Sequence, residues 1–125
     1  MEQPEEFVQN RNKRFVCRLK KSLYGLKQSP RQWYKKFDSF MMSQNYIRSE
    51  YDHCVYFKKL SNGMFIILVL YVDDMLLASK SIEEINRLKT QMARTFDMKD
   101  LGATREILGM EIFRGRSNGK MWLSQ

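Results

Sequence analysis

Two adjacent carboxylates interrupt the most apolar part of the sequence. Asp73 and Asp74 follow a run of nine apolar residues, 64–72, and precede a second apolar run, 75–79. If the chain reverses there, both carboxylates lie at the tip of a hairpin between two buried strands, where oxygen ligands can bind a hard cation. Neighbouring carboxylates repel each other and burial disfavours their charged forms, so a Mg²⁺ ion would stabilise the pair. The alternative is that Asp simply favours a turn, through side-chain bonds to nearby backbone amides.

Short apolar runs predict the strands that hold this hairpin. Cys54 to Lys58 is typical of a strand, Ser61 to Gly63 of a turn, and Phe65 to Val72 of a buried strand that leads to the Asp pair. Met75 to Ser79 predicts the returning strand. A further short alternation, Phe15 to Leu19, predicts a strand near the start of the chain.

Two helices are predicted from apolar spacing and end signals. Ser29 can cap a helix and Pro30 suits its first position, and apolar residues at helical spacing extend the pattern from residue 30 to 44. Ser81 and Glu84 have the spacing of a capping box, which predicts a second helix over residues 82–95. The chain then ends with a second predicted hairpin, in which a turn at Ser117 to Gly119 joins a strand at 107–113 to one at 121–123. The order of elements predicts an α+β fold, an antiparallel sheet with the two helices on one face.

Composition limits the classes that this chain can belong to. Its 125 residues suit one domain, and 43% hydrophobic with 29% charged residues is typical of an ordered globular protein. The two cysteines, Cys17 and Cys54, indicate neither a disulfide framework nor a zinc knuckle. His53 has no neighbouring partners for a metal or nucleophilic site, so we interpret it as structural. No apolar run reaches the roughly 20 residues needed to cross a bilayer, and the first residues do not resemble a signal peptide.

The positive charge is concentrated in one part of the chain. Of the net charge of +8, residues 7–37 contribute ten Lys or Arg and no acidic residue. Phe15, Tyr24, Trp33 and Tyr34 lie among them, a pattern that suits phosphate neutralisation beside aromatic stacking. The alternative is an ordinary solvated basic face.

Five segments in order resemble one protein family. Tyr71-Val72-Asp73-Asp74 resembles the Y-x-D-D motif of reverse transcriptases, and Ser22 to Trp33 closely resembles a segment of the copia-type LTR retrotransposon polymerases. Three further stretches are similar to the same proteins: 1–5, 96–102 and 107–112. The resemblance covers essentially the whole chain and implies a partial reverse-transcriptase palm, from the Pol polyprotein of a Ty/copia-type element.

The resemblance also implies roles for individual residues. Asp73 would ligate catalytic Mg²⁺ with Asp74 assisting, in a two-metal nucleotidyl transfer, and Lys99 is a candidate to protonate pyrophosphate. Leu108 to Glu111 resembles the primer grip, which places Gly109 and Met110 beside the primer end. Residues beside the incoming nucleotide and template would be Tyr24, Gly25, Lys27, Gln28, Arg31 and Tyr71. Three of these roles have a plainer alternative: a turn glycine at Gly25, a solvated lysine at Lys99, and a strand with a glycine bulge at Gly109.

The family site needs a third carboxylate on an upstream strand, and the chain begins too late to contain it. The expectation is therefore a truncated fragment, residues 1–125, that is inactive alone and has exposed strand edges that make it marginally stable. The implied partners are an RNA or DNA template-primer, deoxynucleotide triphosphates and the remainder of the polyprotein, with no membrane. The implied location is a cytoplasmic virus-like particle or the nucleus. The alternative function is a non-catalytic remnant that binds nucleic acid through the basic stretch from Arg11 to Lys36.

Overall fold

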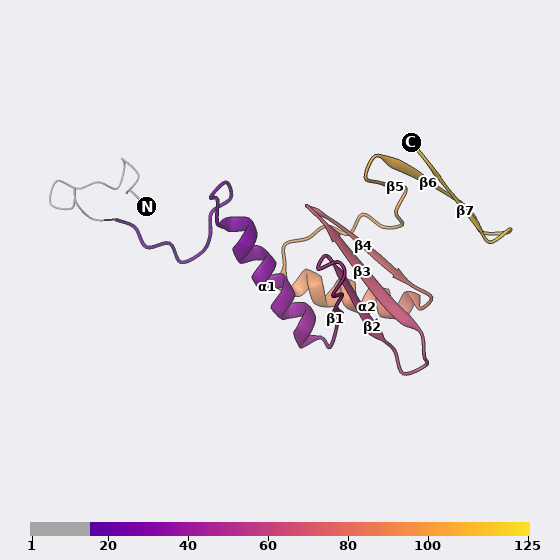
Figure 1. The fold of residues 1–125 in the computed structure, drawn as a ribbon, viewed down its shortest axis with the longest axis horizontal. Helices are drawn as coiled ribbons and strands as arrows, with labels where there is room; N and C mark the ends of the chain where they lie inside the picture. The colour runs from indigo at the N-terminus through magenta and orange to yellow at the C-terminus, as the bar shows by residue number, and fades with distance from the viewer. Residues whose placement is uncertain (1–15) are drawn as a thin grey trace. The chain divides into compact units, whose positions relative to one another are not determined.

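A computed structural model describes residues 16–125 of the chain (Figure 1). The chain divides into two compact units, with the boundary between Gln44 and Asn45. The first unit contains one helix, α1 (Ser29–Ser43), and the second contains all the strands of two antiparallel sheets together with helix α2 (Ile82–Thr95).

Helix α1 forms where the sequence predicts it, but it begins differently. Gln28 is the N-cap residue and makes no side-chain capping bond, while Ser29 and Pro30 lie in the first turn. The Ser29 amide already donates to the Leu26 carbonyl at 2.9 Å, so the preceding turn carries Ser29 into the helix and the predicted Ser29 cap is wrong. Phe37 is fully buried, and the Trp33 ring stacks on it with 5.2 Å between ring centroids.

The strand predicted from Phe15 to Leu19 is not present in the described residues, and Phe15 itself lies outside them. Only Val16 forms a single bridge, and residues 17–19 are irregular. Of the alternating residues that the structure describes, Leu19 is exposed and Cys17 is only partly buried, so neither is part of a core.

A four-stranded antiparallel sheet forms the centre of the second unit. Its strands lie in the order in which they follow along the chain: β1 (Ile47–Arg48), β2 (Val55–Lys59), β3 (Phe65–Tyr71) and β4 (Asp74–Ser79). The turn at Ser61 to Gly63 joins β2 to β3 as predicted, with the Asn62 side chain accepting from the Met64 amide at 3.1 Å. Gly63 takes the left-handed conformation, φ +78°, that this turn requires.

One face of this sheet is buried and carries the core. Directly paired residues share a face, so Ile66, Leu68 and Leu70 of β3 lie on the same side as Tyr56 of β2. Helix α2 contacts β4 and buries its own Leu88 and Met92.

Helix α2 has the predicted bounds and half of the predicted capping box. The Ser81 hydroxyl accepts from the Glu84 amide at 3.3 Å, as expected of a cap. The Ser81 amide is satisfied by Ser79 at 3.1 Å, which leaves the Glu84 carboxylate to pair with Arg87 at 3.4 Å.

The last strands form a second sheet rather than extending the first. The order is β5 (Glu106–Ile107), β6 (Met110–Gly115) and β7 (Lys120–Ser124), all antiparallel. The single strand predicted over 107–113 is wrong, because Leu108 and Gly109 form a two-residue loop between Ile107 and Met110. Both loop residues have positive φ, 55° and 70°, as a type I′ hairpin turn requires.

The α+β class and the antiparallel pairing are thus confirmed, with two sheets in place of the single predicted sheet. The short strands β1 and β5 carry two residues each, too few to give an apolar pattern in the sequence. Within residues 16–125, no helix is both long enough and apolar enough to cross a membrane.

Candidate functional site

The Asp pair lies at the tip of the β3–β4 hairpin, as the sequence predicts. Tyr71 pairs directly with Asp74, so only Val72 and Asp73 form the loop. Asp73 is a loop residue and Asp74 is the first residue of β4. The two carboxylates therefore occupy adjacent positions at the end of the sheet, and one face of this sheet carries the core.

The tip contains an unusual backbone conformation that sequence reasoning missed. Val72 has φ 50°, in the left-handed region that a β-branched side chain rarely adopts. Hairpin loops of two residues prefer a positive φ at their first position, which is where Gly or Asn normally stands. The length of the loop could have predicted this strain, because a chain reversal through only Val72 and Asp73 leaves the Val72 backbone few other conformations.

Both carboxylates are exposed, so the expectation that burial penalises their charge is wrong. Within the described residues, no group of three or more His, Cys, Asp or Glu side chains could hold a metal ion. Two adjacent exposed carboxylates are suitable oxygen ligands for Mg²⁺, but a site made by this chain needs further ligands.

Strand β4 offers a place where such a ligand could be added. It is the last strand in the order β1-β2-β3-β4 and pairs only with β3 among the described residues. Its other edge therefore leaves backbone groups unpaired, starting at Met75, and a further strand can bind such an edge.

Five of the six residues implied to contact nucleotide and template lie in the first unit, whereas the sixth, Tyr71, and the Asp pair lie in the second. Tyr24 is fully exposed, and Lys27, Gln28 and Arg31 are exposed around the start of α1. Gly25 has φ +86° in the turn that the Leu26 amide closes by donating to the Leu23 carbonyl at 3.3 Å. No heavy atom lies within 4 Å of the position that a Cβ would take, so the positive φ of the turn is the constraint that the described residues place on Gly25. Tyr71, half exposed, is the one member of this set beside the Asp pair.

Lys99 lies in the segment between α2 and β5 and is exposed. Its neighbour Asp100 fixes this segment, because one carboxylate oxygen accepts both from Lys89 of α2 at 2.9 Å and from the Gly102 amide at 2.9 Å. These two hydrogen bonds, the Lys89 bond first, lower the pKa of Asp100 below its ordinary value.

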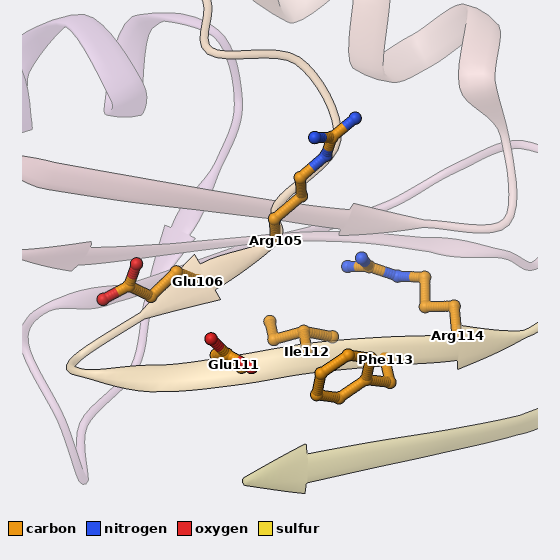
Figure 2. A pocket seen from close by; sticks show the side chains of 6 residues that line it. All are labelled: Arg105, Glu106, Glu111, Ile112, Phe113 and Arg114. Atoms are coloured by element: carbon orange, nitrogen blue, oxygen red, sulfur yellow. The ribbon is translucent and has the colours of Figure 1, made fainter. Parts of the chain in front are cut away.

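The predicted primer-grip residues lie at the β5–β6 hairpin. Gly109 is in its loop and Met110 is the first residue of β6, so the alternative of a glycine bulge within one strand is wrong. Beside this loop is an open pocket of about 400 Å³. Figure 2 shows the side chains of its lining residues, two arginines and two glutamates among them: Arg105, Glu106, Glu111, Ile112, Phe113 and Arg114. The Arg114 guanidinium donates to the Thr104 carbonyl, which ties β6 to the segment before β5.

Tyr46 is a buried polar residue in the second unit. Burial first, and then the Glu84 carboxylate, raise its pKa to about 12. The ammonium group of Lys58 lies 5.5 Å from the centre of the Tyr46 ring, within cation–π range. Tyr46 is therefore part of the structural frame that supports the sheet.

An α+β unit with an Asp pair at the tip of a tight antiparallel hairpin agrees with the resemblance of this chain to a polymerase palm. A family model described as reverse transcriptase (RNA-dependent DNA polymerase) matches residues 1–125. The chain therefore belongs to the reverse transcriptase family.

Relatives within this family come from retrotransposons. The chain is 58% identical over its whole length to the retrovirus-related Pol polyprotein from transposon TNT 1-94 of Nicotiana tabacum, of which it spans 9%. It is 37% identical to a transposon Ty5-1 protein of Saccharomyces cerevisiae, over 99% of the chain and 40% of that protein. It is 30% identical to the Pol polyprotein from transposon RE1 of Arabidopsis thaliana, over 91% of the chain and 8% of that protein. No solved structure gives a significant match.

Proposed function

We propose that residues 1–125 form part of the polymerase domain of a retrotransposon reverse transcriptase, and that Asp73 and Asp74 hold its catalytic Mg²⁺. The observation that carries the proposal is the position of the pair, exposed at the tip of a two-residue hairpin loop on a packed sheet. When bound, two Mg²⁺ ions supply charge stabilisation for the attacking and leaving oxygens of nucleotidyl transfer. Asp73 provides the main carboxylate ligand, and Asp74 assists from the first position of β4.

The third carboxylate of the site comes from a strand that pairs with the open edge of β4. Strand addition at this edge satisfies the unpaired backbone groups and brings its side chains level with Asp74. Among residues 16–125 no group of three such side chains could hold a metal ion, and we expect the isolated chain to be inactive until this strand is added. The same addition would also cover a sheet edge that otherwise favours aggregation.

The remaining predicted residues take binding roles. Lys27 and Arg31 neutralise phosphates, while Tyr24, Gly25 and Gln28 border the nucleotide and template. Tyr71 contacts the nucleotide from beside the Asp pair, Gly109 and Met110 hold the primer end, and Lys99 donates a proton to pyrophosphate. The partners are template-primer, deoxynucleotide triphosphates and the remainder of a Pol polyprotein.

Primer extension in a chimeric polyprotein tests the catalytic proposal. The chain replaces the matching segment of the tobacco Pol polyprotein, which is 58% identical along the whole chain. The parent polyprotein serves as the positive control on an RNA template with Mg²⁺ and deoxynucleotides. We expect the chimera to extend the primer and its Asp73→Asn variant to lose at least about a hundredfold in rate, because metal ligation supplies several kcal/mol of transition-state stabilisation.

The matched control is Asp97→Asn, which removes an exposed carboxylate from the segment after α2. This variant should extend the primer at the chimera's rate. Equal extension by the chimera and its Asp73→Asn variant would overturn the catalytic role of the pair.

A second candidate function is nucleic-acid binding without catalysis. It is favoured by Lys20 and Lys21, which line a surface pocket of about 270 Å³ with Gln28 and Gln32 at the start of α1. Phosphate binding by these groups needs no Mg²⁺ and weakens steeply with salt. An inactive chimera that still binds template-primer equally with Mg²⁺ or a chelator would favour this function.

A further inference from the structure

The β6–β7 hairpin carries two aromatic side chains side by side on an exposed face. Phe113 of β6 pairs directly with Trp122 of β7, and paired residues on one face have Cβ atoms roughly 5 Å apart. Phe113 is 53% exposed and Trp122 is 51% exposed. We call this pair of rings and the face that bears them the aromatic face of the hairpin.

The Trp122 ring rests on the hairpin itself. A Cβ added at Gly115 would lie 2.9 Å from Cζ3 and 3.1 Å from Cη2 of Trp122, so the ring covers Gly115. Glycine at this position lets the ring approach the backbone closely. One side of the indole is thus supported, while half of its surface remains open for contact with a partner.

Positive charge surrounds the turn end of this face. Residues 112–125 contain three basic residues and no acidic one. Lys120 shares the face with Trp122, because alternate residues of a strand point to the same side, and Arg116 lies in the adjoining loop. Lys120 is exposed, and the loop that holds Arg116 places its charge at the same end of the hairpin.

The opposite end of the face differs in charge. Glu111, two residues before Phe113, shares its side and pairs with Ser124. An anionic chain is therefore attracted to the turn end and repelled at the Glu111 end. This polarity distinguishes the aromatic face from a uniformly apolar docking surface.

We propose that the aromatic face binds an unpaired nucleic-acid strand, with bases stacked on Phe113 and Trp122 and phosphates neutralised by Arg116 and Lys120. Aromatic rings beside basic groups are the combination by which proteins bind single strands without sequence preference. A duplex keeps its bases stacked inside, so it offers no equivalent contact. A second copy of this chain brings the same basic turn, which opposes pairing between two such faces.

This binding does not rest on the catalytic proposal. It requires neither Mg²⁺ nor Asp73, and it uses a hairpin separate from the basic stretch at residues 7–37. Failure of primer extension would leave the proposal intact, and failure of strand binding would leave the catalytic proposal intact.

Tryptophan fluorescence tests the proposal directly. The chain has two tryptophans, so a Trp33→Phe variant retains Trp122 as its only indole. We expect a short oligothymidylate or oligouridylate to quench Trp122 emission saturably, with or without a chelator, because stacking a base on the indole quenches it. A blunt duplex of the same length should quench it much less.

Variants then separate stacking from charge. Trp122→Ala should weaken oligonucleotide binding, measured by anisotropy of a labelled strand, by roughly 5- to 150-fold, while Trp122→Phe should retain most of the affinity. Changing both Arg116 and Lys120 to Gln should reduce the slope of log affinity against log salt by about 1.4, since each single-strand contact contributes about 0.7. The matched control is Leu123→Ala, which removes an exposed apolar side chain from the opposite face.

Three results would overturn the proposal. One is unchanged Trp122 emission at oligonucleotide concentrations that saturate the anisotropy signal. Another is equal quenching by duplex and single strand. The third is a Trp122 signal that follows protein concentration instead of oligonucleotide, which would show that the face pairs with a second copy. Circular dichroism of each variant checks that the fold is retained.

Discussion

Two hairpins of this protein have strands of similar length, but their tips carry opposite charges. The β3–β4 hairpin reverses through two residues and presents Asp73 and Asp74, whereas the β6–β7 hairpin reverses through the four residues 116–119 and presents Arg116 and Lys120. The first has one buried face. The second has exposed residues along both of its strands.

The difference shows how packing is matched to the chemistry proposed for each tip. Metal ligands must be held in a narrow geometry, so a tight loop on a packed sheet suits the Asp pair. A strand of nucleic acid tolerates small displacements of the surface on which it stacks. A hairpin whose residues are mostly exposed to solvent therefore suits the aromatic face. Four predictions test this contrast, in order of decreasing effect.

The largest effect is expected from truncating matched leucines in the two hairpins. Leu68 of β3 is fully buried and Leu123 of β7 is more than half exposed. Leu68→Ala should lower the free energy of unfolding by about 2–5 kcal/mol, because it leaves a cavity. Leu123→Ala should change it by no more than about 0.5 kcal/mol. Urea unfolding monitored by circular dichroism measures both, and similar losses would remove the contrast between the hairpins.

Alkaline pH should weaken the packed sheet through Tyr46. Its pKa is about 12 in the folded chain against 10.0 for an ordinary tyrosine, so the unfolded chain loses this proton first as pH rises. The stabilisation is complete below pH 10 and is lost as pH approaches 12, and it amounts to at most about 3 kcal/mol. The free energy of unfolding of wild type minus that of Tyr46→Phe should fall across this interval.

The aromatic face provides the control for this pH experiment. In a Trp33→Phe background, Trp122 emission over the same interval should be the same with and without the Tyr46→Phe substitution. A constant difference in unfolding free energy between wild type and Tyr46→Phe would show that Tyr46 is not the titrating group.

Relieving the backbone strain at Val72, in the tip of the β3–β4 hairpin, should stabilise the chain. A left-handed Val72 costs on the order of 1–3 kcal/mol, and glycine relieves this strain but adds about 0.5–1 kcal/mol of unfolded-state entropy. Val72→Gly should therefore raise the free energy of unfolding by about 1 kcal/mol in a urea titration. Ser117→Gly in the β6–β7 loop is the matched control and should bring no gain, because Ser117 does not have a positive φ.

The smallest effect is expected at Asp100, in the segment that lies between the two hairpins in the sequence. Lys89 and the Gly102 amide lower its pKa, so the stabilisation that they provide is present above the ordinary Asp pKa and is lost as pH falls through the folded value. Titration of the Asp100 carboxyl by NMR should give a midpoint that rises in Lys89→Met. An unchanged Asp100 midpoint would contradict the bond to Lys89.

Much of the fold was predictable because its signals are local. Helix α2 has the predicted bounds, since Ser81 and the apolar spacing after it act within a few residues. The position of the Asp pair at a hairpin tip also followed from the sequence, because two apolar runs flank it. The Ser29 cap and the strand at Phe15 to Leu19 were wrong because nearby turns and the lack of a core outweighed local preference.

The sequence by itself determined the family and the α+β class and predicted a metal-binding role for the Asp pair, because residue types and short-range spacing carry this information. The tertiary structure decided that the strands of residues 16–125 divide into two sheets, that both carboxylates are exposed and that β4 pairs only with β3 among these residues. It also placed Trp122 over Gly115 and beside Phe113. These features depend on which strands pair and on how their side chains pack, which no local pattern specifies.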